Sequence, residues 1–452
     1  MNLDFNKLLL VSCHFPPAGG IQVQRALSLA RYLPAEGFSV HVLTVRNPRV
    51  PTLDNALLDW VPPEVQVHRA STLEPPFFLR KKIWSRIDAR ACPVNDRPQQ
   101  PPPLLRRMVS VAVERALCPD PQILWFPAAL LRARHLIRRH GIGNILVTAP
   151  PFSAFLIGNR LKQEFPDVRL ITDYRDEWLD YYVQTYGFRH SQFVRQRAAE
   201  IECRTVSLSD KIVAATPSAR ATIRRRYPDQ TEGKFCVVAN GFDEEAFSTF
   251  TPRPHSGNKI VVVYTGTIYE PASPARYLDA LDRLPPSLRS RFESRFIGRV
   301  SEEFDRRVLE NRKSDVRLLP FVPHSDALRH MEEADVLLLP WNDVLNIPGK
   351  FYEYMATRKP ILALAPKNTD LAQIIDRTSC GWVFDSDDEQ GLGRFLWDLA
   401  ADGGHVFTRP TNSEIQQYTR RRLASLYASV IRDAGPVGEG EPERARLATA
   451  TK

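Results

Sequence analysis

The sequence is poor in paired cysteines and in metal-binding motifs. Its six cysteines, at positions 13, 92, 118, 203, 236 and 380, are scattered without a C-x-x-C spacing, and the ten histidines include no H-E-x-x-H pair. A disulfide framework and a zinc site are therefore not expected, and unpaired cysteines are typical of a reduced, cytosolic protein. No run of about eighteen apolar residues occurs, so no membrane-spanning helix is expected either.

Repeats of fixed period and the G-x-G-x-x-G fingerprint are also missing. The first absence argues against a solenoid or propeller, and the second argues against NAD or FAD as a cofactor. What remains is a chain of 452 residues with 43% hydrophobic content, which suits two ordinary domains with real cores.

Positive charge is in excess and unevenly placed. The formal net charge is +9, and residues 77–117 alone hold nine Lys or Arg against three acids, which gives +6. This segment suits an anionic membrane surface, whereas nucleic acid is not expected because no nucleic-acid-binding module is recognisable. Residues 104–117 have the apolar spacing of an amphipathic helix, and an insertion helix packed on its own domain is the alternative to membrane docking. The expected membrane contacts are Phe77, Phe78, Arg80, Lys81, Lys82, Trp84, Arg106 and Arg107.

The chain opens with the pattern of a doubly wound α/β sheet. An apolar strand over Lys7–Ser12 is followed by a Pro/Gly-rich loop, a helix over Val23–Leu33 and a second strand over Val40–Thr44. Gly19 and Gly20 in the loop allow a ligand to approach the backbone closely, although a tight turn explains them equally well.

The most informative stretch is residues 334–375, which read as strand, loop, helix, strand, loop and helix. Asn346 to Lys350 lie between a strand end and a helix start, where backbone N–H groups and the helix dipole favour phosphate. Lys350 adds a positive charge there, and Glu353 lies on the same helix face. A surface helix cap with a Lys/Glu pair is the competing interpretation.

A charged cluster, Asp173, Arg175 and Asp176, follows an apolar strand over Leu170–Thr172. Charged side chains at the carboxyl end of a strand lie where such a sheet opens to its ligand. The alternative is structural, with Asp176 capping the following helix while Arg175 pairs with Asp173.

Four motifs in this order resemble the retaining GT-B glycosyltransferases of family 4. They are F-P-P-A-G-G-I-Q-V-Q-R at 15–25, T-D-Y-R-D-E-W at 172–178, A-N-G-F-D at 239–243 and P-G-K-F-Y-E-Y-M-A-T-R-K-P-I at 348–361. The resemblance implies an α/β fold of two Rossmann-like, doubly wound domains facing a central cleft. Residues 1–242 would form the acceptor domain, with a basic insertion at about 73–120, and residues 243–412 the nucleotide-sugar donor domain. Residues 413–435 would be a helix crossing back to the first domain, and 436–452 a disordered tail.

The resemblance also assigns roles. In that family the helix N-terminus meets the donor diphosphate and the Glu holds the ribose or the sugar, which implies these roles for Lys350 and Glu353. A second positive charge would come from Arg299, so no metal or other cofactor is expected. Asp176, then Asp173, are expected to act at the sugar or acceptor, with Glu353 as a further catalytic candidate. The implied donor-binding set is Gly19, Gly20, Gly266, Arg299, Val322, Asn346, Lys350 and Glu353, with Gln22, Gln24 or Arg25 as further candidates.

The sequence departs from the family pattern at one position. Many members carry another Glu eight residues before the one matched by Glu353, and here that position is Leu345. Asn346 or Asp343 could take its place.

The expected function is transfer of a hexosyl group from a nucleotide sugar to a glycan or lipid-linked acceptor, with retention of configuration. Surface polysaccharide or glycolipid biosynthesis is the expected setting, in the cytoplasm or peripherally at the inner face of the plasma membrane. A sugar-nucleotide epimerase or a phosphorylase of the same architecture is one alternative. A non-catalytic, basic membrane scaffold derived from this fold is another, which Leu345 favours and which donor turnover would distinguish.

Overall fold

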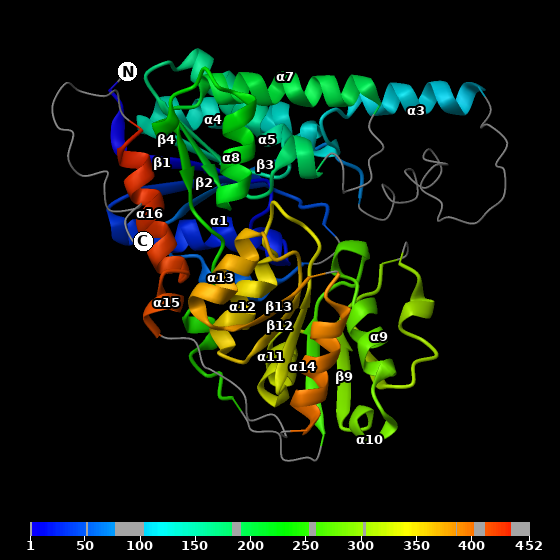
Figure 1. The fold of residues 1–452 in the computed structure, drawn as a ribbon. Coiled ribbons are helices and arrows are strands. Elements are labelled where there is room, and N and C mark those ends of the chain that lie inside the picture. Colours follow the sequence, from blue (N-terminus) through cyan, green and yellow to red (C-terminus); the bar gives the residue numbers. More distant parts are fainter. Residues whose placement is uncertain are drawn as a thin grey trace.

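Two parallel β-sheets, each flanked by helices, form an upper and a lower domain in Figure 1. The structure, a computed structural model, describes residues 2–50, 53–76, 104–182, 191–252, 259–301, 304–385, 387–401 and 412–434. Strand order is β3-β2-β1-β4-β5-β6-β7 in the first sheet and β10-β9-β8-β11-β12-β13 in the second. In both sheets the order reverses next to the strand that comes first in the sequence, which is β1 or β8. The predicted fold class is confirmed.

The first domain contains seven strands and the helices that cover them. The strands are β1 Asp4–Val11, β2 Ser39–Val45, β3 Gln66–Ala70, β4 Ile142–Ala149, β5 Arg169–Tyr174, β6 Lys211–Ala214 and β7 Phe235–Val237. The helices are α1 Ile21–Tyr32, α3 Leu104–Ala116, α4 Phe126–His140, α5 Ser153–Glu164, α7 Gln192–Leu208 and α8 Pro217–Arg226.

The second domain repeats the arrangement with six strands. The strands are β8 Ile260–Thr265, β9 Phe292–Ile297, β10 Asp315–Leu319, β11 Val336–Pro340, β12 Ile361–Leu364 and β13 Gly381–Phe384. The helices are α9 Ala275–Arg283, α10 Pro286–Arg289, α11 His324–Glu333, α12 Gly349–Thr357, α13 Asp370–Thr378 and α14 Glu389–Ala401, followed by α15 Asn412–Gln416 and α16 Arg420–Arg432. Single turns of 3₁₀ or π helix complete the list: η1 Pro34–Glu36, η2 Asn55–Trp60, η3 Pro121–Trp125, η4 Trp178–Tyr182, η5 Glu232–Lys234, η6 Glu245–Phe247, η7 Glu270–Ala272 and η8 Arg306–Val308.

The central strands of each sheet, such as β4, β11 and β12, are buried on both faces, which explains the continuous apolar runs in the sequence. Alternate side chains of β1 enter different cores: Leu9 and Val11 pack with α4 and α5, whereas Leu8 and Leu10 pack with α1 and α16. All four of these side chains are fully buried.

The C-terminal segment returns to the first domain, as predicted, but not as one helix. It is broken between α15 and α16, where Thr419 caps α16 by accepting a hydrogen bond from the Arg422 N–H. Phe242 pairs with the same break, because its N–H donates to the Tyr418 carbonyl and its carbonyl accepts from the Arg420 N–H. Backbone pairing with the interdomain junction therefore replaces helical pairing at this point, and α16 then packs against α1.

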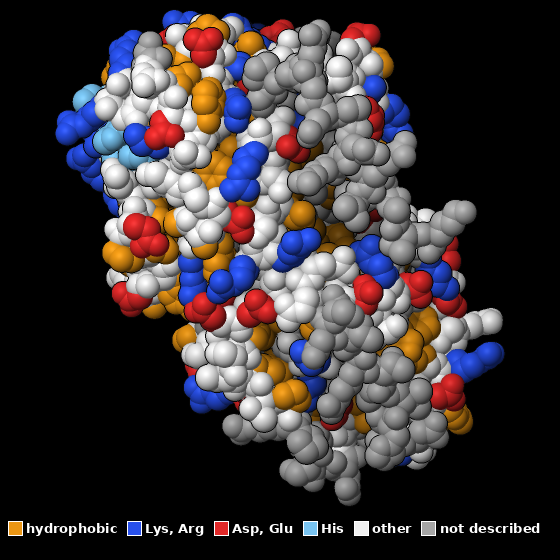
Figure 2. Space-filling view, turned by 90° about the vertical axis from the view of Figure 1, so that its left-hand side faces the viewer, with side chains coloured by type: hydrophobic (Ala, Val, Ile, Leu, Met, Phe, Trp, Pro, Cys, Tyr) orange, Lys and Arg blue, Asp and Glu red, His pale blue; other side chains and the backbone are white. Residues whose placement is uncertain are grey.

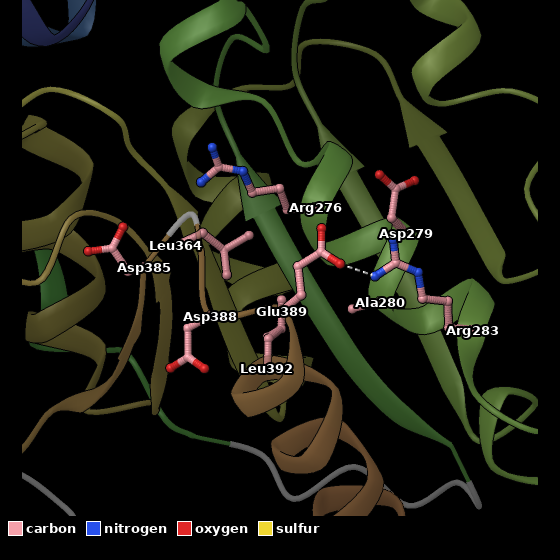
Figure 3. A pocket seen from close by; sticks show the side chains of 9 residues that line it. All are labelled: Arg276, Asp279, Ala280, Arg283, Leu364, Asp385, Asp388, Glu389 and Leu392. Atoms are coloured by element: carbon pink, nitrogen blue, oxygen red, sulfur yellow. Dashed lines mark hydrogen bonds and ion pairs between the residues drawn. The ribbon is translucent and has the colours of Figure 1, made fainter.

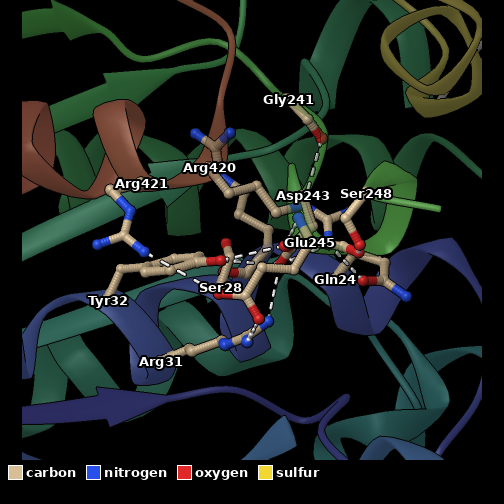
Figure 4. Close-up of polar contacts among 11 residues, drawn as sticks. Gln24, Ser28, Arg31, Tyr32, Gly241, Asp243, Glu245, Ser248, Arg420 and Arg421 are labelled. Atoms are coloured by element: carbon tan, nitrogen blue, oxygen red, sulfur yellow. Dashed lines mark hydrogen bonds and ion pairs between the residues drawn. The ribbon is translucent and has the colours of Figure 1, made fainter. Parts of the chain in front are cut away.

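The interdomain junction is a polar cluster around Asp243 (Figure 4). Its carboxylate accepts hydrogen bonds from the Tyr32 hydroxyl at 3.1 Å and from the Arg31 guanidinium at 3.2 Å, both on α1. Arg420 lies 4.0 Å from the same carboxylate and donates to the Gln24 side chain at 2.7 Å. These contacts join α1, the junction and the start of α16.

The predicted amphipathic helix is present as α3, and the described part of its apolar stripe is exposed. Met108 is 62% exposed and Ala112 and Ala116 are also exposed, while Figure 1 shows α3 extending the line of α7. The predicted membrane contacts from Phe77 to Trp84 lie outside the described residues, as do the side chains of Arg106 and Arg107. Within the described part of the chain, no helix is long and apolar enough to cross a bilayer.

Candidate active site

The candidate residues of the two domains meet where the carboxyl ends of the two sheets face each other. Thr216, which follows β6, donates to the Leu345 carbonyl at 2.6 Å, and the Ser218 N–H donates to Asp370 at 2.8 Å. At the start of α12, a Cβ on Gly349 would lie 2.6 Å from the Ile21 side chain at the start of α1. The helix N-terminus predicted to meet phosphate therefore adjoins the glycine loop of the first domain.

The side chain of Lys350 is held in place by Tyr264 in the second domain. Its Nζ donates to the Tyr264 hydroxyl at 2.6 Å and lies 4.0 Å from the centre of that ring. Burial lowers the pKa of Lys350 to about 7, against the opposing effect of the Glu353 carboxylate. An anionic ligand at this point would restore the charged form of the amine, because opposite charge favours it.

Gly266 is required beside this lysine. Its φ is +127°, a conformation that L side chains rarely adopt, and a Cβ there would lie 2.6 Å from Lys350 Nζ. A methyl group at this position would occupy the space in front of the amine, which is the space that the predicted close approach of a ligand to Gly266 would use.

Arg299 extends from the neighbouring loop after β9. It is exposed and its guanidinium lies 4.9 Å from the centre of the Phe321 ring. The Ile268 N–H donates to the Arg299 carbonyl at 2.8 Å, which holds this loop beside the Gly266 loop. Val322, half-buried, follows Phe321 in the loop before α11. The structure therefore places these predicted donor residues at one edge of the second sheet.

Glu353 lies one turn into α12 and is half-buried. Its charge favours the protonated forms of both Lys350 and Arg420, although burial outweighs it and lowers the pKa of each. The charge of Glu353 therefore acts both on Lys350 at the candidate donor site and on Arg420 at the interdomain junction.

Asp176 and Asp173 occupy very different positions. Asp173 is fully buried, and its carboxylate accepts from Arg25 at 2.8 and 2.9 Å and from the Tyr427 hydroxyl at 2.7 Å. The Asp173 carboxylate therefore pairs with Arg25 rather than with the Arg175 of the structural alternative, and it joins β5 to α1 and α16. This environment favours a structural role over the predicted catalytic one.

Asp176 is half-buried, and burial raises its pKa while the charges of Arg175 and Arg25 oppose that shift. Within the described residues its carboxylate has no hydrogen bond or ion pair. The expected helix cap is made instead by Glu177, whose carboxylate accepts from the Asp180 N–H at 2.7 Å. A half-buried carboxylate with an elevated pKa and no hydrogen-bonding partner is a typical functional group.

The first-domain glycine loop is open at its tip. Gly20 has a φ of +93° and immediately precedes α1, and a Cβ built there would meet no atom within 4 Å. Gly19 is buried beside it. Backbone conformation explains the choice of glycine at position 20, and the space in front of it is available to a ligand.

The two residues considered as replacements for the missing Glu bind each other. Asp343 accepts from the Asn346 side-chain amide at 2.9 Å and from the Leu345 N–H at 2.8 Å, and burial raises its pKa to about 6. The Asn346 side-chain oxygen accepts from the Glu177 N–H at 3.0 Å. Both polar atoms of the Asn346 side chain are therefore engaged within the protein, and a donor contact through them would require these bonds to open.

Sequence reasoning missed the groups that support these residues. Tyr264 accepts a hydrogen bond from Lys350, and the buried carboxylates of Glu177 and Glu202 pair with the half-buried Arg226 next to the Asp176 turn. Arg226 pairs with both carboxylates, and burial raises the pKa of Glu202 to about 7. A tyrosine in an apolar strand and a glutamate within a helix carry no local signal of such roles.

A separate hollow lies between α9 and α14, and none of the candidate residues lines it (Figure 3). It contains charges of both signs, and several are paired: Arg283 with Glu389 at 2.5 Å, Asp279 with Arg312 at 2.5 Å and Asp388 with Lys367 at 2.9 Å. Paired charges leave little net field for an anionic ligand, so this hollow is a weaker candidate. Over the described residues, no group of three His, Cys, Asp or Glu is arranged to hold a metal ion.

Comparison with known proteins gives two family matches. Residues 19–241 match the glycosyl transferase 4-like domain, and residues 259–402 match the glycosyl transferases of group 1. The probable glycosyltransferase WbjE of Pseudomonas aeruginosa is 29% identical over 143 residues, which are 30% of this chain and 35% of that protein, so the match spans about a third of that relative.

Solved structures share the whole fold. Sucrose-phosphate synthase from Thermosynechococcus elongatus superimposes with a TM-score of 0.63 at 15% identity, over 94% of this chain and 98% of that one. Anabaena HepE in complex with UDP and glucose has a TM-score of 0.59 at 14% identity, over 94% and 99% of the two chains. The lipopolysaccharide outer core galactosyltransferase WaaB has a TM-score of 0.57 at 13% identity, over 94% and 99%. At these identities the likeness shows the fold.

Proposed function

The chain belongs to the group 1 glycosyl transferases, and on this premise we propose that it transfers a hexose from a UDP-sugar to a glycan or lipid-linked acceptor with retention of configuration. The donor would bind the second domain and the acceptor mainly the first. One observation carries the proposal: Lys350 lies at the N-terminus of α12 beside Gly266, and Gly349, the residue before it, adjoins Ile21 of the first domain. The complex of HepE with UDP and glucose supports the choice of nucleotide.

The chemistry follows from charge. Transfer breaks the bond between the anomeric carbon and the diphosphate oxygen, and the acceptor oxygen forms the new bond on the same face. The acceptor proton leaves with the departing diphosphate. Lys350, Arg299 and the dipole of α12 would stabilise the negative charge on that leaving group, and such groups act strongly in a site from which water is excluded. Glu353 would orient the donor, and Asp176 would contact the sugar or the acceptor hydroxyl.

The acceptor is proposed to be a surface polysaccharide or glycolipid. The names of two similar proteins, the probable glycosyltransferase WbjE and the lipopolysaccharide outer core galactosyltransferase WaaB, support this class of substrate. Incubation of the protein with donor and a panel of lipid-linked or free glycans would identify the acceptor by mass.

The donor is tested by thermal shift with UDP-, GDP-, dTDP- and ADP-sugars on wild type and on Lys350→Ala. A ligand at about 100 times its Kd adds about 2.7 kcal/mol to stability, which is visible as a rise in Tm. We expect one nucleotide to stabilise the wild type but not Lys350→Ala, and Lys367→Ala, an exposed lysine of the same domain, to behave as wild type.

Three outcomes separate the alternatives. A product with the donor's anomeric configuration, read by NMR, supports a retaining transferase, whereas an inverted product contradicts retention. A free epimer of the donor sugar would indicate an epimerase. Absence of both binding and turnover with every nucleotide sugar would favour the non-catalytic scaffold.

We also propose peripheral association with an anionic membrane at the inner face of the plasma membrane. Two surfaces of the first domain support it. The first is formed by the exposed residues Met108, Ala112 and Ala116 of α3, and the second is the solvent-facing stripe of α4 with Leu131, Arg134, His135, Arg138 and Arg139. In Figure 2 histidines at one edge of the upper domain lie among Lys and Arg side chains. Sedimentation with vesicles of anionic and of neutral lipid tests this, with Met108→Glu and Arg138→Glu/Arg139→Glu as variants. Binding that ignores lipid charge and salt would contradict it.

A further inference from the structure

A chain of hydrogen bonds connects the two domains through Asn346. The Glu177 N–H, in the first domain, donates to Asn346 Oδ1 at 3.0 Å, and Asn346 Nδ2 donates to Asp343 Oδ2 at 2.9 Å. Asp343 Oδ1 in turn accepts from the Leu345 N–H at 2.8 Å. Asn346 and Asp343 are 6% and 7% exposed, so these bonds are formed largely out of water.

The donors and acceptors of this hydrogen-bond chain can be arranged in only one direction. A backbone N–H can only donate, so the oxygen of the Asn346 amide must face Glu177. Its NH₂ group must then face Asp343, which as a carboxylate can only accept. A change of either side chain that alters its donors or acceptors therefore breaks the chain, and an unpaired polar group buried at this point costs about 1–3 kcal/mol.

The hydrogen-bond chain connects two parts of the candidate site that must act together. Glu177 directly follows Asp176, and Asn346 lies in the loop that leads into α12 and Lys350. The Asp176 turn is fixed within its own domain by Glu177, whose carboxylate accepts from the Asp180 N–H and pairs with Arg226. The Asn346 amide adds the contact of this turn with the second domain.

We propose that Asn346 is a positioning residue, which holds the Asp176 turn of the first domain against the loop that precedes the donor-binding helix of the second. Closing the cleft and placing the Asp176 carboxylate are then the same event. The assignment rests on the proposed transferase function. It gives the position next to Leu345 a role in aligning the domains instead of contacting the sugar.

The test is an exchange of the two side chains. Asn346→Asp places two carboxylates face to face, and Asp343→Asn places two amides there with no arrangement that satisfies both the Glu177 and Leu345 N–H groups. The double variant Asp343→Asn/Asn346→Asp restores every donor–acceptor pair, with the carboxylate now facing Glu177. Asn342→Ala is the matched control, because Asn342 is exposed in the same loop.

Amide hydrogen exchange of the peptide around Glu177 reads the contact without any substrate. We expect the Glu177 amide to exchange at least tenfold faster in Asn346→Asp, where the repelled carboxylate moves off it, and either the Glu177 or the Leu345 amide to do so in Asp343→Asn. In the double variant and in Asn342→Ala both amides should exchange at near wild-type rate. Equal exchange in all five proteins, in a chain that is otherwise folded, would overturn the proposed contact. Because amide exchange needs no turnover, it tests the contact between Asn346 and Glu177 even if the protein proves not to be a transferase.

Kinetics test the positioning role itself. We expect each single variant to lower kcat at least tenfold while the Kd for the UDP-sugar changes less than threefold, and the double variant to recover most of kcat. A single variant that weakens donor binding tenfold with kcat unchanged would make Asn346 a donor ligand and overturn the assignment. Loss of kcat that the double variant does not recover, despite restored amide protection, would also overturn it.

Discussion

Donor binding should take up a proton through Lys350. In the ligand-free protein burial lowers the pKa of this amine to about 7, and a diphosphate beside it should raise that pKa toward the ordinary value of lysine. Protonation and donor binding are then linked, so affinity should fall as pH rises above 7.

The magnitude follows from the titration. At pH 8.5, about 1.5 units above the free pKa, only about one Lys350 side chain in thirty carries the proton before binding. The Kd for a UDP-sugar should therefore rise about 30-fold between pH 6 and pH 8.5, which is about 2 kcal/mol at about 1.36 kcal/mol per unit. The diphosphate of a UDP-sugar is a diester without a titration near pH 7, unlike the terminal phosphate of UDP, so the sugar nucleotide is the appropriate probe.

Isothermal titration calorimetry in buffers of different ionisation enthalpy measures both quantities. At pH 8 we expect uptake of about 0.9 proton per bound donor in the wild type and none in Lys350→Arg, whose side chain stays charged throughout. A pH-independent Kd without proton uptake in the wild type would refute the reasoning. The same shift predicts that the ligand-free protein becomes more stable from about pH 7 toward 10.5, because the unfolded chain binds this proton more tightly.

Three further results are expected. Asp173→Asn should lower the free energy of unfolding by about 3–5 kcal/mol in denaturant titration, because it leaves Arg25 buried without its charged partner, and a change below 1 kcal/mol would contradict the structural role. Gly266→Ala should weaken donor binding in a protein that still folds, since its Cβ would lie 2.6 Å from Lys350 Nζ, and unchanged Kd would argue against a donor at this amine. Asp176→Asn should lower kcat with little change in donor Kd or Tm, and full activity would remove Asp176 from the reaction.

Local patterns in the sequence predicted the fold, and they named several residues that the structure brings together at the candidate site. Apolar runs ending in Pro or Gly predicted parallel strands buried on both faces, and the glycine at position 266 straight after β8 predicted close approach to a ligand. Both features depend on neighbouring residues alone: burial on two faces requires a continuous apolar run, and a φ as far positive as the +127° of Gly266 strongly favours glycine. Lys350 was predictable for the same reason, since a helix start after a strand marks an anion site wherever the strand lies in the sheet.

The partners of these residues were not predictable, because they come from distant parts of the chain. Asp173 and Asp176 are three residues apart and look alike in sequence, yet Arg25 and Tyr427, 148 and 254 residues away, occupy the first and leave the second without a partner in the described structure.

Asn346 shows the same limit. Its sequence position suggests a ligand contact, whereas the folded chain aims its amide at Glu177, 169 residues earlier. The sequence by itself determined where strands end and where a helix can receive an anion. Only the tertiary structure decided that Asp173 forms an ion pair while Asp176 has no such partner among the described residues, because that choice depends on which side chains burial brings within hydrogen-bonding distance.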